Sequence, residues 1–243
     1  MTIQEYLNKI RELKIELDKK RPLNEGELRE LRKWYDVTYT YNSNAIEGNS
    51  LTLAETKVVI EDGITIGGKP LREIYEVKNH KEVLERMFDF VKGQGEIEEG
   101  VILNFHKVLL NDIDTENAGI YRNVQVYISG SEDILPPAKE VPSLMRQLYS
   151  WYEESKNLNP CLLAAKFHYK FVKIHPFIDG NGRMARLLMN LILVKNGFPP
   201  VIVPVVRRLE YIRSIQNGEE AFDEFTMSVI VEGLKDYLRM VGE

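Results

Sequence analysis

The stretch from residue 175 to residue 186 reads His175-Pro-Phe-Ile-Asp-Gly-Asn-Gly-Arg-Met-Ala-Arg186. Apolar residues at helical spacing precede it between Leu163 and Ile174, and an apolar run from Leu187 to Val194 follows it. Gly197 and Pro199 then provide a helix stop. The sequence therefore predicts a helix, a tight turn and a second helix.

The tight turn is suited to binding an anion. Gly180, Asn181 and Gly182 allow backbone conformations that direct successive N–H groups at one point. The start of the following helix adds unpaired N–H groups and the positive end of the helix dipole. Arg183 and Arg186 share a face of the first helical turn, where two like charges without a partner are unfavourable. A polyanion bound at the turn would remove this cost.

Two more side chains in the stretch supply groups for chemistry on a polyphosphate. Asp179 offers a hard oxygen ligand for the Mg²⁺ that accompanies such a ligand. His175 closes the first helix and can take a proton from a hydroxyl near neutral pH. Each feature alone has a plainer interpretation as a turn, a helix cap or a solvated face. Their combination at this spacing favours a functional site.

The stretch resembles the signature of the Fic family, H-x-F-x-[D/E/N]-G-N-G-R-x-x-R, and fills each of its fixed positions. Fic enzymes transfer part of a nucleotide, most often AMP from ATP, to a protein hydroxyl. The resemblance implies that His175 is the base that activates this hydroxyl and that Asp179 holds Mg²⁺. It also implies that Phe177 is a packing anchor that fixes the turn.

The resemblance further implies how ATP is held. The turn from Gly180 to Gly182 would cradle the α- and β-phosphates, with Arg183 on the β-phosphate and Arg186 on the γ-phosphate. Beyond the signature, Tyr211 matches an aromatic position that lines the nucleoside in relatives. Asn217 matches a neighbouring amide position only after a shift of one residue.

Composition limits the classes of protein that need to be considered. The chain has 243 residues, of which 44% are hydrophobic and 28% charged, as in soluble globular proteins. A net charge of -5 disfavours a nucleic-acid binder. The single cysteine, Cys161, cannot form a disulfide within the chain, which suits a reducing compartment. No signal-like segment or membrane-length apolar run is present, so we expect a cytoplasmic protein away from membranes.

Two amphipathic helices are expected near the N-terminus, over residues 3–20 and about 27–48. The second ends in Ser43-Asn-Ala-Ile-Glu47-Gly48, in which Gly48 provides a C-terminal stop. Ser43 and Glu47 are four residues apart and share a face. On physical grounds alone, they are expected to be exposed side chains at a fraying helix end.

The Fic resemblance reverses this interpretation. Ser43, Glu47 and Gly48 match the family's inhibitory motif, [S/T]-x-x-x-E-[G/N]. In that family the glutamate reaches the second signature arginine, here Arg186, and blocks productive placement of the ATP γ-phosphate. The resemblance therefore implies a self-inhibited member that carries its inhibitory helix ahead of the core.

More helices are predicted by apolar periodicity. They cover residues 52–61, 71–91, 97–110, 140–154 and 222–240. Thr52 and Glu55 form a capping box at the start of the first of these. His80 and His106 lie in two of the others and are expected to be structural, because the chain's four histidines show no zinc-binding spacing.

Residues 118–130 differ from the rest of the chain. Val124, Val126 and Ile128 alternate with polar residues, which is the period of a strand. An exposed strand of this kind can pair with another extended chain. The segment resembles the Fic flap, whose edge positions the modifiable side chain of the target before the histidine.

Together these features predict a mostly α protein with the Fic fold, a helical bundle carrying a small β-hairpin flap. We expect N-terminal helices over residues 1–95, a Fic core over 96–196 and a C-terminal helical part of the same domain over 197–243. The implied function is a protein adenylyltransferase. It would use ATP and Mg²⁺ to modify a serine, threonine or tyrosine hydroxyl of an unidentified protein target, under inhibition by Glu47.

Three alternatives stay open at this point. A reverse enzyme would remove AMP from a modified target, with Glu47 orienting a water molecule. A different donor, such as UTP or a choline nucleotide, would keep the signature and change the base pocket. A nucleotide-binding regulatory module would catalyse nothing, although an intact His175 disfavours it. The sequence also leaves open whether the chain is a monomer or a homodimer.

Overall fold

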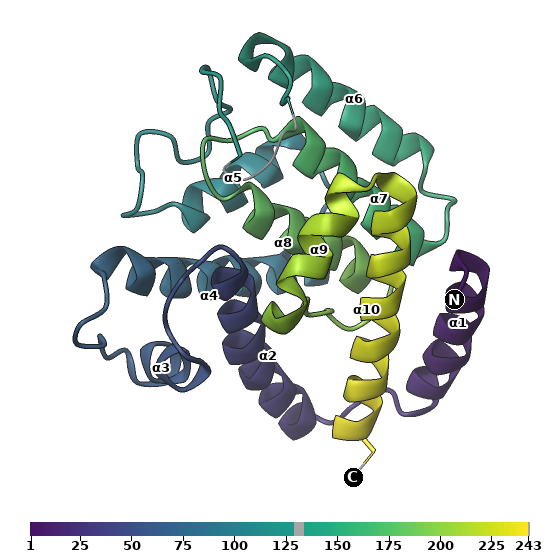
Figure 1. Ribbon diagram of the computed structural model, residues 1–243. Helices are drawn as coiled ribbons and strands as arrows, with labels where there is room; N and C mark the ends of the chain where they lie inside the picture. The colour runs from purple at the N-terminus through teal and green to yellow at the C-terminus, as the bar shows by residue number, and fades with distance from the viewer. Residues whose placement is uncertain (129–133, 243) are drawn as a thin grey trace.

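The computed structural model describes residues 1–128 and 134–242 (Figure 1). All regular secondary structure in these ranges is helical, which confirms the mostly α prediction. The ten α-helices of the described residues are α1 (Ile3–Lys19), α2 (Glu25–Ile46), α3 (Leu53–Lys57), α4 (Leu71–Lys92), α5 (Glu99–Leu109), α6 (Val141–Glu154), α7 (Pro160–Ile174), α8 (Asn181–Lys195), α9 (Arg208–Gln216) and α10 (Glu219–Met240). Short helical segments are η1 (Val58–Asp62, a π-helix), η2 (Ala138–Glu140) and η3 (Val205–Arg207).

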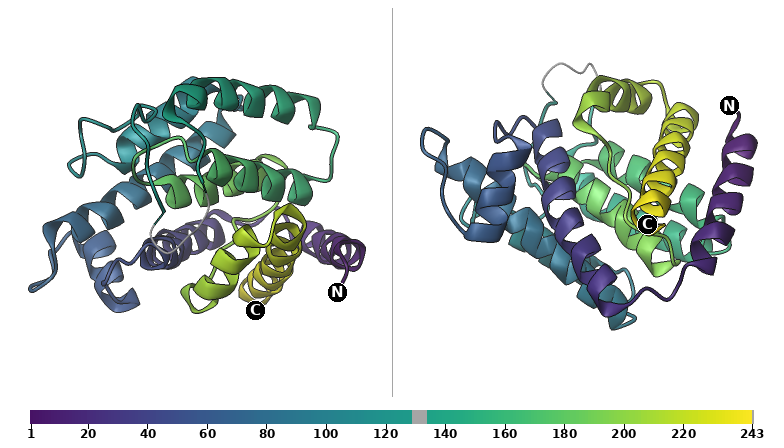
Figure 2. Two further views of the ribbon diagram at one scale, coloured as in Figure 1. Left: turned by 45° about the horizontal axis from the view of Figure 1, so that its top comes forward. Right: turned by 90° about the horizontal axis from the view of Figure 1, so that it is seen from below.

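The centre of the molecule is the hairpin of α7 and α8, which pack against each other (Figure 1). Helix α8 is apolar on most of its circumference, so nearly all its residues are buried. Around this hairpin, α6 and α10 pack on α7, while α4 packs on α8. The N-terminal α1 lies along α10 (Figure 2). The predicted helix–turn–helix at the signature is thus the core of the fold.

One apolar cluster contains residues from all three predicted segments, from Ile10 in α1 to Leu238 in α10. A second, smaller cluster under α3 and η1 consists of Leu51, Val59, Ile74 and Val77. The division into residues 1–95, 96–196 and 197–243 stays a prediction. Over the described residues, none of the helices combines the length and the apolar character required to cross a membrane.

Capping residues set the starts of the N-terminal helices. The predicted box of Thr52 and Glu55 is confirmed at the start of α3. Asn24 and Glu27 form a second box, in which each side chain accepts from the other residue's backbone N–H. Such a cap stabilises a helix by about 1 kcal/mol. It fixes the beginning of α2, the helix whose other end carries the predicted inhibitory motif.

The end of α2 is fastened to its neighbours rather than frayed. The Asn44 side chain donates to the carbonyl of Glu76 in α4, and the Arg208 side chain donates to the carbonyl of Ile46 at 2.6 Å. Ser43 is 1% exposed. The expectation from physical pattern alone, an exposed serine at a fraying end, is therefore wrong, because other helices satisfy the polar groups of this last turn.

The predicted β-hairpin over residues 118–130 is also wrong for the described residues, none of which forms a strand. The return arm contains Pro136 and Pro137, which have no N–H to donate to a ladder. Side chains join the arms instead: Gln125 donates to the carbonyl of Leu135 at 3.2 Å, and Arg122 donates to that of Pro136 at 2.6 Å. Residues 129 and 130 of the predicted strand lie outside the described residues.

Candidate active site

The signature loop, residues 175–180, joins α7 to α8. His175 ends α7 in a left-handed conformation, with φ 51°, and its N–H donates to the carbonyl of Phe171 at 3.0 Å. Gly180 has φ 78° immediately before α8, a conformation that glycine adopts without strain. The first N–H groups of α8, from Asn181 onward, have no carbonyl one turn earlier and are available to an anion.

Two buried groups hold the loop in shape. The Asn181 side chain donates to the carbonyl of Phe177 and accepts from its N–H, each at 2.9 Å. The Asn181 side chain is therefore engaged within the loop, and its backbone N–H remains for an anion. The ring of Phe177 is fully buried and stacks on His106 with centroids 3.6 Å apart, as expected of a packing anchor.

His106 has a structural role that positions Asp179. The N–H of Gly119 donates to His106 Nδ1 at 2.9 Å, so the ring proton lies on Nε2, which donates to the Asp179 carbonyl at 3.0 Å. Burial lowers the pKa of His106 to about 4, so the ring is neutral. This contact could not be predicted from the sequence, because His106 precedes Asp179 by 73 residues and stands in no motif with it.

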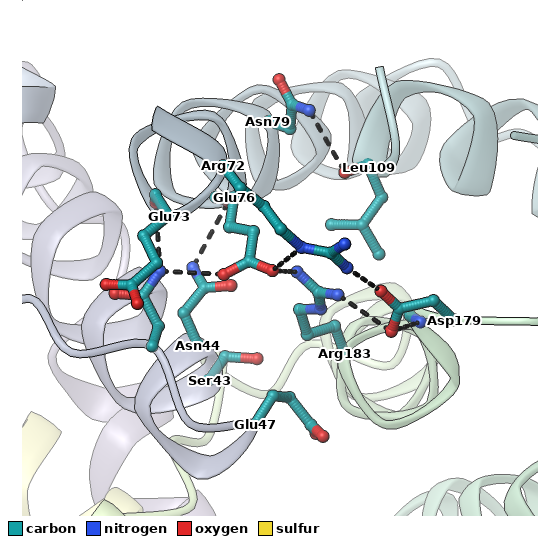
Figure 3. A network of polar contacts seen from close by, with 12 residues as sticks. Ser43, Asn44, Glu47, Arg72, Glu73, Glu76, Asn79, Leu109, Asp179 and Arg183 are labelled. Carbon is teal, nitrogen blue, oxygen red and sulfur yellow. Dashed lines mark hydrogen bonds and ion pairs between the residues drawn. The ribbon is translucent and has the colours of Figure 1, made fainter. Parts of the chain in front are cut away.

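Asp179 is surrounded by donors (Figure 3). Its Oδ1 accepts from the Gly180 N–H at 2.6 Å and from Arg183 at 3.3 Å, and its Oδ2 accepts from Arg72 Nη2 at 2.5 Å. Burial alone would raise the pKa of Asp179, but Arg183, the Gly180 N–H and Arg72 together lower it below its usual value. Asp179 is therefore ionised at neutral pH. Sequence reasoning did not identify Arg72.

Arg183 and Glu76 continue the same network. Arg183 is 2% exposed, and its Nη1 lies 3.4 Å from Glu76 Oε1. Glu76, in α4, also accepts from Asn49 Nδ2 at 3.0 Å and from Arg72 Nε at 3.4 Å. Arginines and carboxylates thus alternate across the space between α4 and the start of α8, as Figure 3 shows.

Arg186 is fully buried and bound to the end of α2. Its Nη2 donates to Glu47 Oε1 at 2.7 Å and to the Ser43 carbonyl at 2.8 Å, while its Nε donates to Ser43 Oγ at 3.1 Å. Burial alone would lower the pKa of Arg186, but Glu47 and Tyr211 raise it above its usual value. The expected contact between Glu47 and Arg186 is therefore present, across 139 residues of sequence.

Tyr211 and His168 lie behind Arg186. Arg186 Nη1 donates to the Tyr211 hydroxyl at 3.3 Å, so this hydroxyl donates in turn to His168 Nε2 at 3.1 Å. Burial lowers the pKa of His168 well below its usual value, which leaves its ring neutral and able to accept. Tyr211 is buried, whereas Asn217 is exposed at the end of α9. The predicted contact of both residues with a nucleoside stays a prediction.

His175 is half-buried and lies next to the segment that contains Val124, Val126 and Ile128. Arg122 joins the two, because its Nε donates to the His175 carbonyl at 2.8 Å and its Nη1 to the Val124 carbonyl at 3.2 Å. Burial lowers the pKa of His175, against opposing effects of the Val172 carbonyl and the carboxylates of the site. Its imidazole is consequently neutral at pH 7 and can accept a proton.

Gly182 permits the close approach of Glu47. A Cβ added at residue 182 would overlap the Glu47 carboxylate, and it would lie 3.2 Å from Arg186 Nη1. The second glycine of the signature therefore makes room for the end of α2. This requirement was not visible in the sequence, where Gly182 was assigned only to the anion-binding turn.

A metal ion would have to rely on few protein ligands here. Within residues 1–128 and 134–242, no group of three or more histidine, cysteine or acidic side chains could hold a metal ion. Mg²⁺, however, is commonly held by one or two carboxylates together with substrate phosphates. The ionised and partly exposed carboxylate of Asp179, next to an anion-binding helix start, fits that type of site.

Comparisons with known proteins agree with this geometry. A family model for the Fic/DOC family matches residues 96–193. The curated protein adenylyltransferase fic-1 of Caenorhabditis elegans is 39% identical over 191 residues, which cover 77% of this chain and 37% of that protein. The chain thus spans well under half the length of this relative.

Solved structures extend the similarity to nearly the whole chain. A structure of part of Fic-1 from C. elegans has a TM-score of 0.88 and 32% identity, and the match covers 98% of this chain and 72% of that one. A Fic domain-containing signaling protein from Bacteroides thetaiotaomicron has a TM-score of 0.89 and 26% identity, covering 96% and 97%. The chain therefore belongs to the Fic/DOC family.

Proposed function

We propose that this protein transfers AMP from ATP to a hydroxyl group of a target protein. The observation that carries the proposal is the turn that opens α8, which combines a neutral His175, an ionised Asp179 and two buried arginines, Arg183 and Arg186. The name of the curated relative, protein adenylyltransferase, supports the same activity.

The reaction needs a base and an anion site side by side. The hydroxyl oxygen of the target attacks the α-phosphorus of ATP while His175 takes the hydroxyl proton. A new oxygen–phosphorus bond forms, and the bond to the oxygen that bridges the α- and β-phosphates breaks. AMP then stays on the target and pyrophosphate leaves.

The protein's own groups would stabilise the charge that develops. The free N–H groups at the start of α8 would bind the α- and β-phosphates, and Arg183 would contact the β-phosphate. Asp179 would hold Mg²⁺, which, when bound, neutralises charge on the phosphates. The segment that contains Val126 would align the target beside His175.

The contact of Glu47 with Arg186 supports self-inhibition. A guanidinium that binds a carboxylate at 2.7 Å is not free to bind the γ-phosphate of ATP. In addition, the carboxylate would repel the phosphate. We infer that ATP binds with its γ-phosphate misplaced as long as Glu47 keeps this position.

The test is incubation of the purified chain with labelled ATP and Mg²⁺, followed by mass spectrometry of the added group. We expect an AMP adduct on the protein itself or on added proteins, and more of it in Glu47→Gly. Parallel reactions with UTP and CDP-choline distinguish the donors. If Glu47→Gly binds ATP in calorimetry but forms no adduct with any donor, the transferase proposal is wrong.

Removal of AMP is the second candidate. The observation that favours it is that Glu47 lies near His175, whose pKa it helps to raise, while 39% of its side chain remains exposed to solvent. Such a carboxylate could orient a water molecule. Incubation of an adenylylated protein with the wild type and Glu47→Gly tests this, because AMP release that depends on Glu47 would identify the reverse enzyme.

A cytoplasmic location remains part of the proposal, based on the single buried Cys161.

A further inference from the structure

Arg72 binds the carboxylate that the proposed function assigns to the metal. It lies in the first turn of α4, and its Nη2 donates to Asp179 Oδ2 at 2.5 Å (Figure 3). The other oxygen of Asp179 already accepts from Gly180 and Arg183. Both carboxylate oxygens are therefore in use.

Arg72 is the most easily released of these three donors. The Gly180 N–H belongs to the backbone of the signature loop, and Arg183 is 2% exposed. By contrast, the Arg72 side chain is 57% exposed. A change of side-chain rotamer would move its guanidinium away from Asp179 without disturbing the core.

The position of Arg72 needs its acidic partners. A cation in the first turn of a helix faces the positive end of the helix dipole, which is unfavourable. Asp179 on one side and Glu76, four residues later on the same helix, compensate for this. When Arg72 leaves Asp179, Glu76 remains as a partner on the same helix face.

A guanidinium and Mg²⁺ compete for Oδ2 of Asp179, because both are cations that must lie close to the same oxygen. Mg²⁺ requires a carboxylate oxygen at about 2.0–2.1 Å in a nearly octahedral shell. An arginine nitrogen at 2.5 Å occupies that direction and repels the incoming cation. Metal binding at Oδ2 is therefore favoured when Arg72 moves away.

We propose that Arg72 competes with the divalent cation for Asp179 Oδ2. The inference rests on the proposed function, because it assumes that Asp179 receives the metal. Each part of a metal–ATP ligand then meets a residue that is already paired. Glu47 is bound to Arg186, the proposed ligand of the γ-phosphate, and Arg72 is bound to Asp179, the proposed ligand of the cation. Metal and triphosphate then displace two opposite charges together.

Calorimetry of a non-cleavable ATP analogue, α,β-methylene-ATP, tests the competition. Its Kd is measured with saturating Mg²⁺ and again in EDTA, and the ratio of the two values reports the coupling between metal and nucleotide. All variants also carry Glu47→Gly, so that the contact of Glu47 with Arg186 does not mask the effect of Arg72 on Asp179. They are Arg72→Gln, Asp179→Asn and, as the matched control, Arg86→Gln, since Arg86 is another exposed arginine of α4 with an acidic partner, Glu82.

We expect Arg72→Gln to increase the coupling about tenfold, which corresponds to about 1.4 kcal/mol. The gain should come from tighter binding in Mg²⁺, whereas Arg86→Gln should leave the coupling unchanged. If Arg72→Gln leaves it unchanged or lowers it while Asp179→Asn abolishes it, the competition is refuted and the proposed metal site stands. If Asp179→Asn has no effect, the metal assignment of the proposed function fails, and the competition fails with it.

Discussion

His175 is held by its neighbours in a conformation that a non-glycine residue rarely adopts. Its φ of 51° costs on the order of 1 kcal/mol or more. The conformation persists because Phe171 accepts from its N–H and Arg122 donates to its carbonyl. Because both backbone groups are bonded, the Cα–Cβ bond of His175 has a fixed direction close to the start of α8.

His175→Ala should abolish AMP transfer while ATP affinity changes by less than about tenfold, because the imidazole acts on the hydroxyl and not on the phosphates. Since burial lowers the pKa of His175, the base is already neutral at pH 7. The kcat/KM of the wild-type enzyme should therefore fall only when the pH drops below about 6.5, the ordinary pKa of a histidine. A pH profile and calorimetry check both statements; transfer by His175→Ala within tenfold of wild type would exclude the role of base.

Gly182→Ala should have opposite effects in two backgrounds. In the wild type the added Cβ displaces the Glu47 carboxylate from Arg186, so we expect a loss of about 1 kcal/mol of unfolding free energy. In Glu47→Gly the carboxylate is absent, and only the end of the Arg186 side chain, with Nη1 3.2 Å from the added Cβ, has to shift slightly. Alanine also favours the helix over glycine by up to about 1 kcal/mol. Urea unfolding of the four proteins forms a double-mutant cycle. Additive effects would show that Gly182 does not make room for Glu47.

The functional residues of the signature could be predicted from the sequence because they stand next to one another in it. The residues that contact them from other parts of the chain could not be predicted. Arg72 contacts Asp179 across 107 residues, and Arg122 contacts His175 across 53. Neither arginine stands in a recognisable motif. Only the contact between Glu47 and Arg186 was anticipated, and that expectation came from the family resemblance rather than from charge or spacing.

At the scale of elements, helices with clear apolar periodicity were predicted within a few residues. The expected helix over residues 71–91 corresponds to α4, Leu71–Lys92, and that over 97–110 to α5, Glu99–Leu109. Helix α9 was not predicted, because it is short and many of its residues are polar. The strand over 118–130 is wrong as far as residue 128, where the described part of this segment ends, because alternation shows which side chains share a face and does not supply a partner strand.

Arg122 takes the place of a ladder in this segment, which leads to a prediction. Arg122→Ala removes the hydrogen bonds to four carbonyls, those of Val124, Pro136, Ile174 and His175, so we expect a loss of about 2–3 kcal/mol of unfolding free energy. Modification of a protein target should fall more than ATP affinity, because the segment lies beside the base. Arg146→Ala, at an exposed arginine of α6, is the control. Equal losses in target modification and ATP affinity would contradict a positioning role for the segment.

At the scale of the whole molecule, the chain brings an early helix end to the site formed much later. Helix α2 starts at a capping box, packs along α4 and delivers Ser43 and Glu47 to the start of α8. Attachments at Asn44 and Ile46 hold this end in place. The contact between Glu47 and Arg186, which we propose to be inhibitory, is therefore a property of the folded topology, and a substitution of Glu47 alone would remove it without removing a helix.

Glu47→Gly should raise AMP transfer at saturating ATP by about a hundredfold, because a reacting atom misplaced by about 1 Å costs a factor of that order. ATP affinity should change little, since the proposed contacts of the α- and β-phosphates with the start of α8 do not involve Glu47. Arg186 keeps its bonds to Ser43 and Tyr211 in the variant, so it should remain positioned for the γ-phosphate.

Arg186→Ala is the control that separates release of the arginine from loss of the glutamate. It also breaks the contact with Glu47, but it removes the γ-phosphate ligand and leaves the polar groups of Ser43 and Tyr211 without their buried partner. It should therefore stay as inactive as the wild type or become less active. AMP incorporation is measured for all three proteins under the same conditions. Equal rates for Glu47→Gly and wild type would rule out inhibition by Glu47, and activation by Arg186→Ala would rule out a need for that arginine at the γ-phosphate.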